Sequence, residues 1–126
     1  MGNNAEASIV FGFGIDLHEH EEIALRVLGP ESKYESETDF YDWPEILVNH
    51  LKEKNVLSDK IQVHRVGYYD EPDYFIGVQL AWACDYTADE LDVEKLVVTD
   101  DDKKELTLLG QSFGREPKMW LCPYGG

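Results

Sequence analysis

The run His18-Glu19-His20-Glu21-Glu22 is the densest group of metal-ligating side-chain types in the sequence. On a helix, His18 and Glu22 lie one turn apart on the same face, whereas His18 and His20 point about 200° apart. A zinc helix of the His-Glu-x-x-His type needs two histidines on one face, so the run does not meet the geometry of that motif. We interpret it as the polar first turn of a helix, and we predict no resident metal and no cofactor.

The other histidines and the cysteines give weaker signals for catalysis. His50 and His64 have no Ser, Cys or Asp beside them in a catalytic arrangement, although such units also assemble from residues far apart in the chain. Cys84 and Cys122 have no adjacent cation that would favour a reactive thiolate. We interpret both cysteines as structural, packed as small apolar side chains.

Two short motifs have simpler explanations than ligand binding. Asp100-Asp101-Asp102 follows Thr99 and lacks the twelve-residue spacing of a calcium loop, so it predicts the capped, acidic first turn of a helix. Gly12-Phe13-Gly14 lacks the third glycine of a phosphate-binding loop. It indicates either a close backbone approach or a thin face of a sheet.

The strongest signal is the charge of the whole chain. The sequence has 26 Asp and Glu against 11 Lys and Arg, a net charge of -15 on 126 residues, while 43% of its residues are hydrophobic. The hydrophobic content predicts a folded core, so most of the acids must lie outside it. Such a surface repels nucleic acid and anionic membranes and attracts a basic protein surface, although acids that only confer solubility would look the same.

Acids and aromatics alternate in two segments, which makes these segments the candidate contact surface. Carboxylates on a rigid surface can imitate the phosphates of a duplex, and tyrosines can supply contact anchors. A surface where the tyrosines merely cover the edge of the core is the alternative. The predicted partner-binding residues lie in a long loop and around a hairpin tip: Glu35, Glu37, Asp39, Tyr41, Asp70, Glu71, Asp73 and Tyr74.

The elements that position these residues follow from hydrophobic periodicity. We expect strands over 8–17, 61–69, 74–84 and 118–122, helices over 18–28, 42–54 and 99–113, an acidic loop over 31–42 and a turn at 70–73. This order predicts a single α+β domain over 1–126, with a four-stranded antiparallel sheet, helices on one face and a topology that resembles the ferredoxin-like one. The open face of the sheet would then carry exposed acids and aromatics.

The ends of the chain and its cysteine content indicate a compartment. The first residues lack a basic region and a long apolar segment, and no apolar run approaches the roughly 20 residues of a membrane span. Two cysteines are too few for a disulfide framework. We expect a cytoplasmic protein that contacts no membrane and binds no nucleic acid directly.

Two short stretches resemble a group of small acidic proteins encoded by bacteriophages. These are Glu116-Pro117-Lys118-Met119-Trp120-Leu121 and Phe11-Gly12-Phe13-Gly14, in an order of elements that is also similar. Proteins of that group often inhibit host nucleases or defence complexes, including CRISPR complexes. The resemblance implies an anti-defence role in the cytoplasm of a host cell and assigns no role to any single residue.

Three hypotheses from different classes follow. The first is a non-enzymatic inhibitor that binds a basic, nucleic-acid-binding host protein, by DNA mimicry or by blocking a surface. The second is a small metal- or nucleotide-dependent enzyme that uses His18, Glu22 or His64 beside a carboxylate. The third is a structural or assembly protein, for which a stable homo-oligomer would be the sign.

Overall fold

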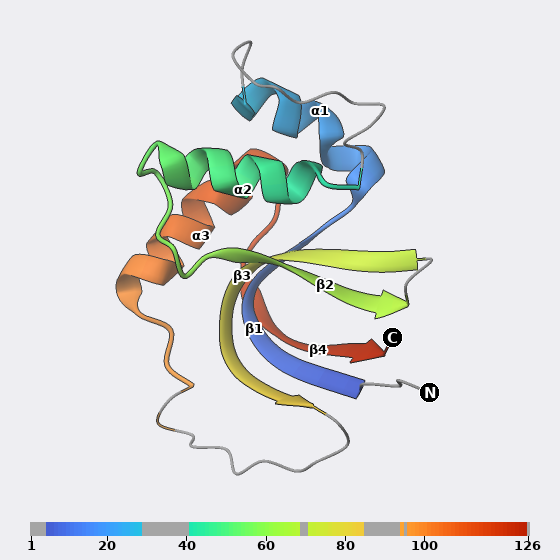
Figure 1. Ribbon diagram of the computed structural model, residues 1–126. Helices are drawn as coiled ribbons and strands as arrows, with labels where there is room; N and C mark the ends of the chain where they lie inside the picture. Colours follow the sequence, from blue (N-terminus) through green and yellow to red (C-terminus); the bar gives the residue numbers. More distant parts are fainter. Residues whose placement is uncertain (1–4, 29–40, 69–70, 85–93, 95, 126) are drawn as a thin grey trace.

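The computed structural model describes residues 5–28, 41–68, 71–84, 94 and 96–125, and Figure 1 shows how the elements are arranged. The elements in chain order are β1 (Ala5–Ile15), α1 (Leu17–Leu28), α2 (Trp43–Glu53), β2 (Gln62–Tyr68), β3 (Glu71–Cys84), α3 (Asp100–Phe113) and β4 (Lys118–Gly125). The expected α+β class, with four antiparallel strands and three helices, is confirmed. No helix in this described part is long and apolar enough to cross a bilayer.

The four strands form a curled sheet in the order 2-3-1-4. β1 pairs antiparallel with both β3 and β4, and β2 pairs antiparallel with β3. The curl brings the two edge strands together at one parallel bridge, Gly67 to Tyr124, which closes a small barrel. The sequence suggested a sheet with one open face, and this expectation is wrong because the sheet curls into a closed barrel. The three helices lie together beside one end of it (Figure 1).

Strand boundaries differ from the expected ones at the hairpin and at the C-terminal end. Glu71 pairs with Tyr68, so the predicted turn at 70–73 is wrong for three of its four residues, because 71–73 belong to β3. β4 continues to Gly125, although Pro123 was expected to end it. Pro123 pairs with Ala7 of β1. Because β4 is an edge strand, a proline there costs no ladder hydrogen bond on its outer side.

The third helix agrees with its predicted caps. Thr99 accepts a hydrogen bond from the backbone N–H of Asp102 at 3.1 Å, and Gly114 ends the helix in the left-handed conformation with φ 66°. Asp42 occupies the N-cap position of α2, as expected, but its side chain makes no capping hydrogen bond. Its carboxylate is therefore left to face solvent, where the residue is exposed.

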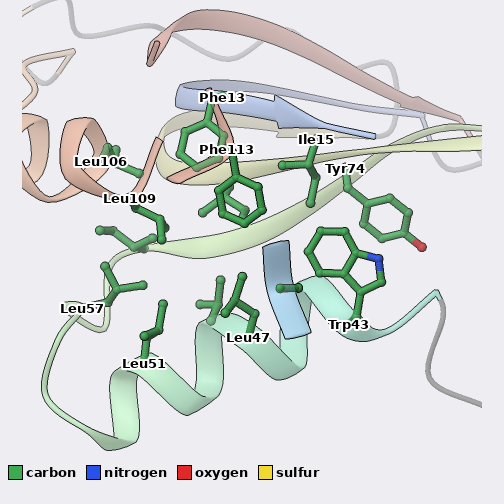
Figure 2. Packing of buried hydrophobic residues seen from close by; sticks show 14 of the residues in the cluster. Phe13, Ile15, Trp43, Leu47, Leu51, Leu57, Tyr74, Leu106, Leu109 and Phe113 are labelled. Atoms are coloured by element: carbon green, nitrogen blue, oxygen red, sulfur yellow. The ribbon is translucent and has the colours of Figure 1, made fainter. Parts of the chain in front are cut away.

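The core lies between the helices and the end of the sheet where β1 finishes and β3 begins (Figure 2). Trp43 is fully buried and stacks on Phe113, with ring centroids 6.3 Å apart and an interplanar angle of 14°. Phe113 also contacts Phe13, with centroids 5.7 Å apart. The indole Nε1 of Trp43 donates to the Leu17 carbonyl oxygen at 3.3 Å, which satisfies its only polar atom.

A pair of glycines sets the distance between β1 and β3. Gly12 lies opposite Gly77, and a Cβ on Gly12 would come within 2.0 Å of the Ile76 carbonyl oxygen. The Trp120 indole donates to the Gly12 carbonyl oxygen at 2.9 Å, and its ring lies 5.1 Å from that of Phe75. Of the two interpretations of the glycines, the close backbone approach therefore holds at Gly12.

Candidate protein-binding surface

The negative charge is unevenly distributed along the chain. Among the residues whose side chains the structure describes, thirteen are acidic and nine are basic. The remaining residues carry the other thirteen acids and only two bases. Most of the net charge therefore belongs to the connecting segments 29–40, 69–70 and 85–95 and to the start of β3 at 71–73, and the rest of the folded frame is closer to neutral.

The predicted contact residues fall into three groups. Glu35, Glu37, Asp39 and Asp70 lie outside the described residues, and the same holds for the side chains of Glu71 and Asp73, whose backbones begin β3. Tyr41 is 62% exposed, directly before α2. Tyr74 is 4% exposed, which assigns its ring to the core.

Tyr74 of β3 lies close to the residues at the start of α2. Burial is the main cause that raises the pKa of its hydroxyl, opposed by the Arg65 charge and reinforced by Asp42, Glu45 and Tyr41. The Arg65 guanidinium lies 5.9 Å from the centre of the Tyr74 ring. Figure 2 shows the hydroxyl at the rim of the core cluster. The first turn of α2 and the middle of the β2–β3 hairpin are thus neighbours.

We call this group the acidic corner: Tyr41, Asp42, Glu45, Arg65 and Tyr74. The corner is of interest because acidic segments of the chain adjoin its residues in the sequence. In the sequence, the segment 29–40 directly precedes Tyr41, and the connection 69–70 directly precedes β3, the strand that contains Tyr74. Two acidic segments that are about 30 residues apart in sequence are therefore attached to one rigid place, which Trp43 and Tyr74 hold in the core.

A groove of about 250 Å³ continues from the corner between α2 and β2. Glu45 belongs to both, and Asn49, Lys52 and Gln62 add polar side chains to the lining. Side chains of this kind can form hydrogen bonds and ion pairs with a partner that covers the corner.

A comparison of the chain with protein-family models, curated proteins and solved structures finds no match. The corner is therefore interpreted from its own chemistry.

The described side chains of the His18–Glu22 run, which exclude Glu21, do not form a ligand cluster. His18 and Glu22 are exposed, whereas His20 is 5% exposed and its ring packs edge-on against Phe113, with centroids 5.3 Å apart. Burial, and then the Arg115 charge, lower the pKa of His20. Within the described part of the chain, no group of three or more His, Cys, Asp or Glu could hold a metal ion.

The other candidate residues have structural roles that the fold makes visible. Cys122 is buried and unpaired, and burial raises the pKa of its thiol, as expected for a structural cysteine. The side chain of Cys84 lies outside the described residues. The imidazole Nε2 of His64 lies 3.3 Å from the Gly77 carbonyl oxygen, and burial lowers the pKa of this histidine.

Sequence reasoning missed several residues that matter here. Asp16 caps α1, since its Oδ1 accepts the His18 N–H at 2.8 Å, and this bond is the main cause that lowers the pKa of Asp16. The spacing Asp16 to Glu19 is a capping-box signal that could have identified it. No local pattern could have placed Glu45 and Arg65 beside Tyr74, because that juxtaposition joins a helix to a distant hairpin.

Proposed function

We propose that this protein is a non-enzymatic, acidic protein-binding module that inhibits a basic, nucleic-acid-binding protein, in the manner of a bacteriophage anti-defence protein. The observation that carries the proposal is the attachment of two acidic segments, 29–40 and 69–73, to the acidic corner. Segments whose ends continue into one rigid corner can act together on one partner surface, and this is the arrangement that we propose.

Charge and aromatic contact would contribute to binding in different ways. The field of a chain with net charge -15 raises the rate at which a basic partner approaches, and salt screens this effect. Affinity after contact depends on anchors that exclude water, and Tyr41, 62% exposed at the corner, is the candidate among the described residues. The exposed carboxylates of Asp42 and Glu45, close to Tyr41 in the sequence, can accept hydrogen bonds from Lys and Arg side chains of the partner.

The proposal extends to the fold. A ferredoxin-like topology is supported by the strand order 2-3-1-4, which read from the other edge is 4-1-3-2, and by helices that follow β1 and β3. A second helix between β1 and β2 and the closing bridge are additions to that pattern. DNA mimicry would be the form of inhibition if the carboxylates of the two segments track a nucleic-acid groove.

The test is an affinity capture from bacterial host lysate at low and at high salt, followed by binding kinetics with the captured protein. We expect a basic nucleic-acid-binding protein, lost at high salt, whose nucleic-acid binding the chain blocks. The triple variant E35Q/E37Q/D39N should lower the association rate constant about tenfold at low salt.

The matched control is the triple variant E53Q/D101N/E116Q, which removes the same charge from exposed positions on the folded frame. It should change the association rate constant less than about twofold. Capture that is indifferent to salt, or equal loss in both triple variants, would refute the corner as the binding surface. A stoichiometric metal in the purified chain would instead favour the enzyme hypothesis.

A further inference from the structure

A second hollow, of about 470 Å³, lies away from the acidic corner, where β2 begins and the segment before α3 passes β3. Its apolar wall is formed by Val78, Leu80 and Val97. Asp102, from the first turn of α3, lines the same hollow. The volume is within the usual range of ligand-binding pockets, so the space is large enough for side chains of a bound molecule.

The hollow lies beside an open strand edge. β2 pairs with β3 only as far as Gln62 opposite Gly77, whereas β3 continues to Cys84 and pairs there with β1 on its other side. No described strand pairs with the outer edge of β3 beyond Gly77. Figure 1 shows this part of β3 curving away from β2. An unpaired edge presents N–H and C=O groups that an extended peptide can bind.

Asp102 supplies an independent sign of a ligand. The residue is only 6% exposed, and its backbone N–H is used in the helix cap with Thr99. Its carboxylate accepts no hydrogen bond from any residue of the described chain. Lys60 also lines the hollow, yet no ion pair within the described residues joins the two. The Asp102 oxygens are not among the fully buried unpartnered atoms, so the carboxylate reaches the hollow, where a cationic group can form a charge-assisted hydrogen bond with it.

We propose that this hollow binds an extended peptide segment, which adds to the outer edge of β3 as a strand and places a Lys or Arg side chain against Asp102. Val78, Leu80 and Val97 receive an apolar side chain of the same segment. The occupant is a basic peptide because a chain of net charge -15 attracts cations and repels a second copy of itself. The site is separate from the acidic corner and does not depend on the function proposed for it.

The experiment uses a set of fluorescein-labelled eight-residue Thr-Val repeat peptides, each with one Lys at a different position, and measures anisotropy with the full chain. At least one position of the Lys should give saturable binding. In ¹⁵N-labelled protein, that peptide should shift the amide signals of residues 78–83. Replacing its Lys by norleucine should weaken binding about tenfold.

Two protein variants distinguish peptide binding at Asp102 from a general effect of the negative charge of the protein. D102N should weaken binding of the Lys peptide about tenfold, whereas D101N, which removes the same charge from the exposed neighbouring residue, should leave it unchanged. E35Q/E37Q/D39N should also bind the peptide normally, so failure of the corner and failure of this site are distinguishable. The thermal unfolding of D102N confirms that the variant is folded.

A second probe tests the strand edge without changing the protein. The same peptide with alternate N-methylated residues on its binding edge should lose binding, because its backbone donors are removed. Equal affinity for the Lys and norleucine peptides, or shifts confined to residues 41–45 and 48–52 of the acidic corner and its groove, would overturn the proposal. So would a concentration-dependent dimer in sedimentation that V97E abolishes, since a second copy would then be the occupant.

Discussion

The two ends of the sheet differ in what covers them. At the helix-covered end, where β1 finishes and β3 begins, Phe13 and Phe113 are 1% and 3% exposed. At the other end, Trp82 is 49%, Met119 50% and Leu121 72% exposed. Burial of apolar area is the main favourable term in folding, so the larger cluster at the covered end supplies most of the stability, and the small cluster of Val10 and Cys122 adds to it at the other end. The difference indicates that changes at the exposed positions of the uncovered end can be made without unfolding the protein.

The largest expected effect comes from breaking the covered end. Phe113→Ala removes a ring that contacts Phe13, Trp43 and His20, and should lower the free energy of unfolding by about 3–5 kcal/mol. Leu121→Ala, at the uncovered end, should change it by less than about 0.5 kcal/mol. Urea denaturation of both variants measures the contrast. Similar losses in the two would show that the uncovered end is packed in solution.

A smaller effect is expected where the two ends join. Gly12→Ala places a Cβ against the Ile76 carbonyl oxygen and the Gly77 Cα, both backbone atoms that cannot rotate away. We expect a loss of about 1–3 kcal/mol in the free energy of unfolding, from forced separation of β1 and β3.

Gly14→Ala is the control for that substitution. The nearest atom to its new Cβ is on the Phe75 ring, at 3.3 Å, and a side chain can move by the small amount required. Thermal unfolding should therefore rank Gly12→Ala well below Gly14→Ala in stability. Equal stability of the two variants would mean that the glycine pair does not limit the approach of the strands.

The third prediction concerns pH and tests the covered end through His20. The folded-state pKa of His20 is lowered by burial and by Arg115, so on acidification the unfolded chain takes up the proton first. Stability is then complete above the ordinary histidine pKa of about 6.5 and decreases as the pH falls below it. His64, with a pKa lowered by burial, contributes with the same sign.

The measurement is the free energy of unfolding between pH 7.5 and 5 for two variants. His20→Leu should flatten the pH dependence without removing it, since His64 remains. Leu25→Ala, at an exposed position of the same helix, changes no titratable group and should leave the slope as it is in the original chain. An unchanged slope in His20→Leu would contradict the conclusion that His20 contributes to the pH dependence of stability.

Local patterns were enough for much of the secondary structure. The periodicity of Leu106, Leu109 and Phe113, with Thr99 before and Gly114 after, predicted α3 because helix formation and capping depend on neighbours a few residues away. The antiparallel hairpin was predicted for the same reason, although its turn was placed two to three residues too long. The predicted ends of strands were wrong where pairing with a neighbouring strand extended the strand beyond the residues whose local pattern predicted it.

The candidate sites could be predicted only in part. The sequence indicated acidic loop and hairpin segments but gave no reason for them to share a corner, which depends on the packing of α2 against β2. It also placed Trp82 on one face with Tyr74. An irregularity in the pairing, with Val10 opposite Gln79 and Ile9 opposite Ala81, lies between the two, and Trp82 is 49% exposed.

By itself, the sequence determined the α+β class, the three helices with the caps of α3, and the excess of negative charge, because periodicity, capping chemistry and composition are local or additive properties. Only the tertiary structure decided which residues meet. Three features depend on contacts between residues far apart in the chain. They are the curl that Gly67 and Tyr124 close, the acidic corner around the buried Tyr74, and the position of the Asp102 carboxylate beside the open edge of β3. Such contacts follow from the packing of the whole core, which no single segment specifies.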